Sequence, residues 1–202
     1  MKEYRLMSGD NGRTKRLIVA ITGATGAILG IRALKVLSEM GVETHLILSR
    51  WAKATISLET DLKPEEVQRM ASRCHSAEDM AATISSGSVW TDGMLVIPCS
   101  MRTLSGIRHG FGDSLVTRAA DVVIKERRRL VLVPREMPLS EIHLENMLAL
   151  ARMGVSIVPP MPAFYNKPES VDDIVDHIVA RALDQLGIEV PSAKRWKGVR
   201  CS

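Results

Sequence analysis

Residues 17–30 read Leu17-Ile-Val-Ala-Ile-Thr-Gly-Ala-Thr-Gly-Ala-Ile-Leu-Gly30. Five apolar residues lead into a turn of small residues and then into a helical pattern, which is typical of a buried parallel strand followed by a helix. Gly23 and Gly26 allow a tight turn and the close approach of a ligand, and Gly30 allows the helix to pack on the sheet. We expect the helix N-terminus to be open to an anion. This stretch therefore predicts a phosphate-bearing ligand, a nucleotide or a flavin.

The same alternation of short apolar runs and amphipathic segments continues to the end of the chain. Strand-like runs cover residues 42–48, 94–97, 130–133 and 155–158. Helical patterns cover residues 31–40, 51–58, 63–73, 114–125, 141–153 and 171–186, and a further helix begins near residue 100. Residues 75–90 have no readable pattern and are expected to form a loop. This order predicts an α/β fold, a doubly wound, Rossmann-like and mostly parallel sheet with helices on both faces.

Length and composition indicate one globular domain. The chain has 202 residues, of which 46% are hydrophobic, enough to bury a core without cross-links. We expect a flexible leader over 1–15, an α/β domain that binds the phosphate-bearing ligand over 16–190 and a C-terminal tail over 191–202. The net charge of +4 is modest and only 3% of residues are aromatic, so a nucleic-acid site built on base stacking is not expected. Acidic small molecules fit the charge better.

The cysteines and the hydropathy pattern indicate the compartment. Cys74, Cys99 and Cys201 show no CxxC spacing, which predicts neither a disulfide framework nor a metal site and favours a reducing environment. No apolar run approaches the roughly 18 residues of a membrane span, and the polar first residues do not resemble a secretory signal. We therefore expect a cytoplasmic protein.

Polar residues follow the predicted strands, where an open α/β sheet binds its ligands. They are residues 22–27, Ser49, Arg50, Ser100, Arg102, Thr103, Arg135 and Glu136, with Phe164 and Tyr165 after the last strand. Each has a structural alternative: hydroxyls at strand ends commonly cap the next helix, and neighbouring charges commonly form surface ion pairs worth under ~1 kcal/mol. Their convergence on one edge nevertheless predicts a ligand site there.

One alternative at this site is a small NADP-dependent oxidoreductase. A nicotinamide site prefers an acid after the second strand, whereas this chain has Ser49 and Arg50, and only Arg50 could pair with a 2′-phosphate. The glycine spacing is GxxGxxxG and not GxGxxG. A single phosphate therefore suits a flavin mononucleotide better.

Several longer motifs resemble one known family. They are Thr22-Gly-Ala-Thr-Gly-Ala27, Pro98-Cys-Ser-Met-Arg-Thr-Leu104, Arg118-Ala-Ala-Asp-Val-Val-Ile-Lys-Glu-Arg127, Leu130-Val-Leu-Val-Pro-Arg-Glu-Met-Pro-Leu139, Ile142-His-Leu-Glu-Asn-Met147 and Pro162-Ala-Phe-Tyr165. Together they resemble the UbiX/Pad family of flavin prenyltransferases, including the small subunits found beside hydroxyarylic acid decarboxylases. The resemblance extends from about residue 16 to residue 196.

The resemblance implies a reaction and its participants. Such enzymes join the dimethylallyl group of dimethylallyl phosphate to N5 and C6 of reduced FMN, and the prenylated FMN serves a separate UbiD-type decarboxylase. The family uses no metal. The resemblance also implies a homo-oligomer, a dodecamer, whose sites lie between subunits.

The resemblance also implies roles for residues. FMN would be held by Gly23, Ala24, Thr25, Ser49, Ser100, Met101, Arg102, Thr103 and Arg135, with Arg118 close by. The prenyl donor would be held by Lys125, Tyr165 and Arg181, together with Arg135. Relatives often have serine where this chain has Thr25, which keeps the hydroxyl of a proton relay and adds a methyl group.

Chemical reasoning about the residues agrees with these roles. A leaving phosphate needs charge-assisted hydrogen bonds, which Lys125, Arg135 and Arg181 can donate. Glu136 and Glu59 are candidates for proton handling, and Glu136 is the stronger because a neighbouring cation keeps it in place. With Thr25, whose role the resemblance implies, the expected catalytic set is Glu136, Thr25, Lys125 and Glu59.

Two further alternatives stay open. One is an FMN-dependent decarboxylase that acts directly on its own substrate; it would need a working histidine, and neither His45 in a strand nor His143 in a helix fits that role readily. The other is a partner of a decarboxylase that holds FMN without catalysis. A scaffold would not need the second phosphate site that Lys125, Tyr165 and Arg181 imply.

Overall fold

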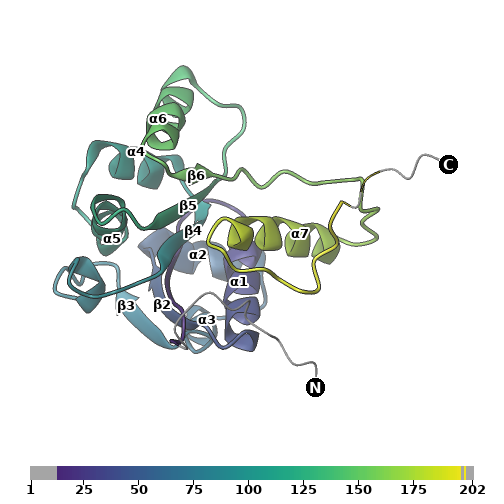
Figure 1. Cartoon of the computed structure of the whole chain (residues 1–202), viewed down its shortest axis with the longest axis horizontal. Helices are drawn as coiled ribbons and strands as arrows, with labels where there is room; N and C mark the ends of the chain where they lie inside the picture. The colour runs from purple at the N-terminus through teal and green to yellow at the C-terminus, as the bar shows by residue number, and fades with distance from the viewer. Residues whose placement is uncertain (1–12, 197, 199–202) are drawn as a thin grey trace.

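A computed structural model describes residues 13–196 and 198. The core of the molecule is a six-stranded parallel sheet in the order β3-β2-β1-β4-β5-β6 (Figure 1). The strands are β1 (Arg16–Ile21), β2 (Glu43–Leu48), β3 (Arg73–Ser76), β4 (Gly93–Cys99), β5 (Arg129–Pro134) and β6 (Ser156–Ile157). The strand order reverses between β1 and β4, as in a doubly wound fold. The predicted fold class is confirmed.

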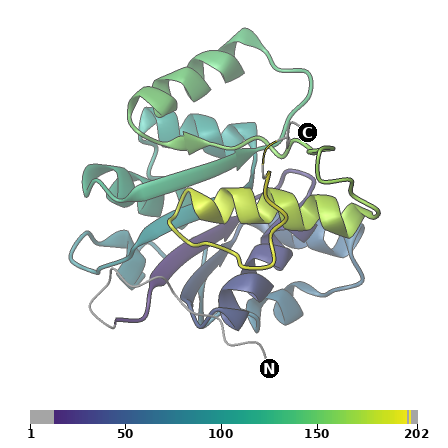
Figure 2. The same ribbon diagram turned by 45° about the vertical axis from the view of Figure 1, so that its right-hand side comes forward.

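Helices cover both faces of this sheet (Figure 2). They are α1 (Ala27–Glu39), α2 (Arg50–Glu59), α3 (Pro64–Gln68), α4 (Met101–His109), α5 (Leu115–Lys125), α6 (Glu141–Arg152) and α7 (Val171–Asp184), with a short 3-10 helix η1 (Thr83–Ser85). α1 and α7 pack together on one face, and α4 packs with α5 and α6 on the other.

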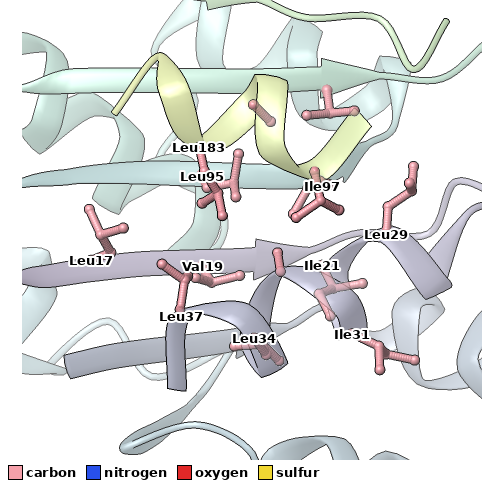
Figure 3. Close-up of a cluster of buried hydrophobic side chains, with 14 of the residues drawn as sticks. Leu17, Val19, Ile21, Leu29, Ile31, Leu34, Leu37, Leu95, Ile97 and Leu183 are labelled. Atoms are coloured by element: carbon pink, nitrogen blue, oxygen red, sulfur yellow. The ribbon is translucent and has the colours of Figure 1, made fainter. Parts of the chain in front are cut away.

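The alternation of side chains along β1 produces two cores. Leu17, Val19 and Ile21 point to the α1 and α7 face, where Leu37 and Leu183 cover them (Figure 3). Ile18 and Ala20 point to the other face. A strand that is apolar on both faces is the signature of a central parallel strand. The sequence pattern of residues 17–21 reflects this burial.

Gly30 lets α1 approach the sheet, as its position in the sequence predicted. A Cβ atom at Gly30 would lie 2.6 Å from the carbonyl oxygen of Ile97 and 2.7 Å from the side chain of Ile21. Any larger residue would push α1 away from β1 and β4.

Two segments differ in detail from the prediction. The helix expected over 63–73 ends at Gln68, and the strand β3 follows it, pairing in parallel with β2 at the edge of the sheet. β3 reads Arg-Cys-His-Ser and is mostly exposed, so it lacks the apolar signature of the inner strands. The expected loop over 75–90 contains η1, and Arg128 holds it by donating to the carbonyl oxygens of Gly87 and Val89, each at 2.8 Å.

The structure describes only parts of the predicted leader and tail. β1 begins at Arg16, while most of the predicted leader lies outside the described residues. Within the predicted tail, Ala193 packs against the core and Trp196 contacts Tyr165. Of the helices that the structure describes, none has the length and apolar character needed to cross a membrane.

Candidate active site

Thr22 ties the ends of the two central strands together. Its buried hydroxyl donates to the carbonyl oxygen of Pro98 and accepts from the backbone N–H of Ser100, both at 2.8 Å. The turn after β1 and the turn after β4 therefore lie side by side where the strand order reverses. Ligands bind at this position in open α/β sheets.

A cavity of about 670 Å³ opens at this edge, a size within the range of small-molecule sites. Its lining includes Gly23, Ser49, Arg50, Trp51, Ser100, Arg102, Thr103, Phe111, Asp113, Ser114 and Thr117. Five of the predicted FMN residues are thus brought together, namely Gly23, Ser49, Ser100, Arg102 and Thr103.

Three helix N-termini end at this cavity. Ser49 caps α2 by accepting from Ala52 N at 3.1 Å, and Ser100 caps α4 by accepting from Thr103 N at 3.3 Å. Ser114 caps α5 in the same way. Each cap uses one of the free N–H groups of its first turn, so capping and ligand binding are compatible. Together with Arg50 and Arg102, these N-termini make the cavity suited to an anion.

The N-terminus of α1 is occupied by the protein itself. Glu59 accepts from Gly26 N and Ala27 N, both at 2.9 Å. The prediction that this N-terminus is open to an anion is therefore wrong. Ala24 and Thr25 lie on the same turn, beside the cavity but outside its lining, with Thr25 exposed. Glu59 acts here as a helix cap, and proton transfer by Glu59 stays a prediction.

The remaining predicted FMN residues do not line the cavity. Met101 packs with the second core. Arg135 is bonded to the end of β4 through its backbone N–H, which donates to Cys99 O at 3.1 Å, and its side chain is exposed. Glu136 follows it and is also exposed. Arg118 is directed elsewhere, since it donates to Ser85 O at 3.2 Å and to Asp121 at 3.0 Å.

Two aromatic rings of the cavity were missed from the sequence. Trp51 and Phe111 are 61% and 60% exposed, so both offer apolar surface to a ligand. A Cβ atom at Gly23 would lie 2.3 Å from Trp51 Cβ, so the two residues are in close contact. Trp51 could have been found by extending the search to the third residue after the end of β2.

Tyr165 and Arg181 line a second hollow, of about 380 Å³, on α7. Its other lining residues are His177, Ala180, Asp184, Ala193, Lys194, Arg195 and Trp196. The Tyr165 ring lies edge-on to His177 and to Trp196, with centroid distances of 5.7 and 5.5 Å. Tyr165 and Arg181 were predicted from the sequence, whereas His177 was missed. His177 lies within α7 and does not follow a strand, where the search for site residues was made.

Lys125 is not close to either group of residues within one chain. It ends α5, about 12 Å along the helix from Thr117 at the cavity. α5 and α7 lie on opposite faces of the sheet, so Lys125 is also separated from Arg181. The ammonium of Lys125 lies 3.8 Å from the carboxylate of its neighbour Glu126.

The two histidines considered from the sequence have structural partners. The His45 ring is 2% exposed; its Nδ1 lies 3.0 Å from His75 Nε2, and its Nε2 lies 3.2 Å from Glu43. His143 accepts from Ser140 N at 3.2 Å and so caps α6. Neither lines the cavity. Among the described residues, no group of three or more His, Cys, Asp or Glu is arranged to hold a metal ion.

Comparison with known proteins gives a consistent result. The family model described as Flavoprotein matches residues 6–183. A "Probable UbiX-like flavin prenyltransferase" of Streptomyces sp. (strain D7) is 64% identical over 188 residues, which cover 93% of this chain and 94% of that protein.

Two solved structures are also similar over almost the whole fold. One, described as a dodecameric FMN-dependent UbiX-like decarboxylase from Escherichia coli O157:H7, has a TM-score of 0.89 and 67% identity, covering 91% of this chain and 100% of that one. The other, described as AnUbiX (PadA1) in complex with FMN and dimethylallyl pyrophosphate, has a TM-score of 0.91 and 54% identity, covering 93% and 100%.

Proposed function

The chain belongs to the Flavoprotein family and, within it, to the UbiX-like flavin prenyltransferases, and from this membership we propose how its two hollows share the reaction. The enzyme transfers the dimethylallyl group of dimethylallyl phosphate to FMN. Membership in this family removes the NADP-dependent oxidoreductase as an alternative. The cavity at the strand ends takes FMN, and the hollow on α7 takes the prenyl donor.

The single observation that carries the FMN assignment is the meeting of three serine-capped helix N-termini at one cavity. We place the FMN phosphate against the first turns of α2 and α4, where Ser49, Ser100 and Thr103 supply hydroxyls. Trp51 and Phe111 supply apolar surface for a planar ring. These residues fit FMN in size and charge. When bound and reduced, FMN supplies the electron-rich ring that accepts the prenyl group.

The donor assignment rests on the chemistry of the second hollow. Arg181, Lys194 and Arg195 line it together with the carboxylate of Asp184 and the hydroxyl of Tyr165. Lys194 and Arg195 also pair with Asp173 and Glu189, at 3.8 and 3.6 Å, so the half-exposed Arg181 is the cation most available to a ligand. An anionic phosphate suits the guanidinium of Arg181 and the hydroxyl of Tyr165, and donors aimed at the phosphate stabilise it as it leaves. We propose the monophosphate as the preferred donor, and Glu136 as the residue that handles a proton.

We further propose that the complete site is shared between subunits of a homo-oligomer, a dodecamer as in the relative from E. coli O157:H7. The two hollows have no lining residue in common, and Lys125 reaches neither. A second copy of the chain can bring them together. Exposed apolar residues on α6, namely Ile142, Leu144 and Leu148, at 68%, 53% and 52% exposure, provide surface for such contacts.

For the biological setting we propose that a UbiD-type decarboxylase receives the prenylated FMN and that the enzyme works in the cytoplasm. The resemblance to the family supports the recipient. The described cysteines, Cys74 and Cys99, are free thiols, in keeping with a reducing compartment.

The experiment that tests the function is an anaerobic incubation with FMN, dithionite and dimethylallyl phosphate, followed by mass spectrometry of the released flavin. A flavin heavier by one five-carbon prenyl unit is the expected product. Tightly bound but unmodified FMN would favour the second candidate, a decarboxylase that acts directly on its own substrate. One similar structure is described as an FMN-dependent UbiX-like decarboxylase. Absence of flavin binding would contradict both.

A further inference from the structure

Asp184, the last residue of α7, joins two arginines at the donor hollow. Its Oδ2 accepts from Arg181 Nη1 at 2.7 Å and from Arg195 Nη1 at 2.9 Å, and its Oδ1 accepts from Arg195 Nη2 at 2.7 Å. The carboxylate is only 14% exposed. Burial alone would raise the pKa of Asp184, but the hydrogen bonds and charges of Arg195 and Arg181 hold that pKa below its ordinary value. The two arginines therefore favour the ionised form of Asp184.

The two arginines are committed to different degrees. Arg195 gives both terminal nitrogens to Asp184 in a fork, and its Nε lies 3.6 Å from Glu189. Arg181 gives Asp184 only Nη1, and its side chain is 53% exposed. A guanidinium has five N–H donors in a fixed plane. Anchoring one terminal nitrogen of Arg181 therefore fixes the plane in which its remaining donors can meet a ligand.

The fork of Arg195 also fastens the segment that follows α7. This segment turns at Gly187, buries Ile188 and Val190 in the first core, and returns beside α7 (Figure 2). Arg195 is the residue before Trp196, whose ring lies edge-on to Tyr165 at 5.5 Å. Trp196, a lining residue of the hollow, therefore directly follows the residue that is paired with Asp184.

We propose that Asp184 and Arg195 form a positioning clasp for the prenyl donor: Asp184 orients Arg181 toward the donor phosphate, and Arg195 holds Trp196 against Tyr165 so that the apolar part of the hollow is closed. The proposal rests on the proposed function, because it takes the hollow on α7 as the donor half of the site. It makes Asp184 and Arg195 positioning residues, since they act through Arg181 and Trp196.

The geometry favours this role over simple anchoring of the chain end. Ile188 and Val190 bury the first part of the segment after α7, so that part is anchored by the core, and Arg195 fixes the later part that carries Trp196. A fork on a nearly buried carboxylate adds a fixed direction, which a lysine cannot reproduce because its ammonium is a single point charge. The carboxylate that accepts this fork, Asp184, also accepts a hydrogen bond from Arg181.

The test compares Asp184→Asn and Arg195→Lys with Arg32→Gln as the matched control. Arg32 of α1 pairs with Asp172 and Asp176, which lie on α7 like Asp184, but Arg32 is outside the donor hollow. Dimethylallyl phosphate and FMN are titrated separately into each variant by calorimetry, and KM for the donor and kcat are measured in the prenylation assay. Trypsin cleavage after Lys194, followed by mass spectrometry, reports how firmly the segment is held.

We expect both test variants to weaken donor binding about tenfold or more, because a charge-assisted hydrogen bond and its direction are lost, with FMN affinity unchanged. Cleavage after Lys194 should be faster in both variants, and the donor should slow cleavage in the unsubstituted enzyme. Arg32→Gln should change none of these. Arg195→Lys keeps the charge, so it remains informative where Asp184→Asn does not fold.

Three outcomes would overturn the clasp. Donor affinity that is unchanged in Asp184→Asn and Arg195→Lys would make the ion pair structural. An equal loss of donor and FMN affinity would indicate general destabilisation. Donor affinity that is the same in Arg181→Ala as in the unsubstituted enzyme would show that the hollow on α7 is not the donor site. If the unsubstituted enzyme still prenylates FMN, the proposed function itself survives that result. Absence of prenylated flavin, with donor affinity altered as expected, would contradict the function and leave the clasp in place.

Discussion

Glu59, the last residue of α2, accepts a hydrogen bond of 2.9 Å from the backbone N–H of Ala27, the first residue of α1. The same carboxylate oxygen accepts from Gly26 N. A negative charge of the protein thus occupies the position where the glycine-rich turn predicts a ligand anion. We therefore place the anion at the neighbouring N-termini of α2, α4 and α5, which line the cavity.

We expect Glu59→Ala to lower the free energy of unfolding by about 1 kcal/mol, because two N–H groups of the first turn of α1 lose their acceptor. Glu59→Gln keeps an acceptor oxygen and should be closer to the unsubstituted protein. Urea denaturation measures both. The prenylation rate of a stable Glu59→Gln variant then separates capping from proton transfer: an unchanged rate removes Glu59 from the catalytic set.

Thr22→Val should weaken both stability and FMN binding. The substitution keeps the shape of the side chain but leaves the partly buried N–H of Ser100 without its acceptor, at a cost of about 1 kcal/mol. It also loosens the turn on which Ser100 caps α4 at the cavity. Thr22→Ser retains the hydroxyl and is the control. Equal FMN affinity in the two variants would show that the Thr22 bridge does not support the cavity.

Gly23→Ala tests the close contact behind the cavity. The added methyl group would lie 2.3 Å from Trp51 Cβ, so the turn after β1 or the start of α2 must move. We expect FMN affinity to fall about tenfold or more, since both segments line the cavity. Gly112→Ala is the control, because a Cβ there meets open space. Flavin fluorescence titration measures the affinity, and equal affinities in the two variants would argue against the assigned cavity.

The inner part of the fold follows directly from the sequence, and the edge does not. Residues 17–21 and 94–97 are apolar on both faces because they lie in the middle of a parallel sheet, so their pattern is strong. β3 pairs with only one neighbour and is built of polar residues, so its pairing depends on β2 and leaves no periodic signal.

The site divides in the same manner. Gly23, Ser49 and Ser100 could be found because the ends of parallel strands meet at one edge by topology alone. The occupation of the α1 N-terminus by Glu59 and the placement of Trp196 on Tyr165 depend on how distant segments dock. Such contacts follow from packing and have no local pattern.

Stability should decrease as the pH falls below about 6.5, the ordinary pKa of histidine. Burial lowers the pKa of His45, with the charge of His75 adding to this effect and the hydrogen bond to Glu43 opposing it. Burial also lowers the pKa of His75. The unfolded chain then binds protons that the folded chain does not, so stability is full above the unfolded pKa and is lost on acidification.

Urea denaturation at several pH values between 7.5 and 5.5 measures this slope. In His75→Gln the slope should be shallower, because one of the coupled rings is removed. His109→Gln changes an exposed histidine and should leave the slope as it is. A slope in His75→Gln as steep as in the unsubstituted protein would assign the acid sensitivity to other groups.

Lys125 and Arg181 lie on opposite faces of the sheet, so a site that uses both must take them from different copies of the chain. We expect Lys125→Ala and Arg181→Ala to be nearly inactive as separate oligomers. Co-assembly of the two in equal amounts should restore activity, because random mixing gives both native residues to about a quarter of the shared sites. The prenylation assay on mixed oligomers measures the recovery.

Arg181→Ala mixed with Tyr165→Phe is the matched control: both residues line one hollow of one chain, so every hollow in that mixture carries a defect. Recovery in the first mixture and none in the second would establish sharing between subunits, whereas equal behaviour of the two mixtures would place Lys125 outside the donor site.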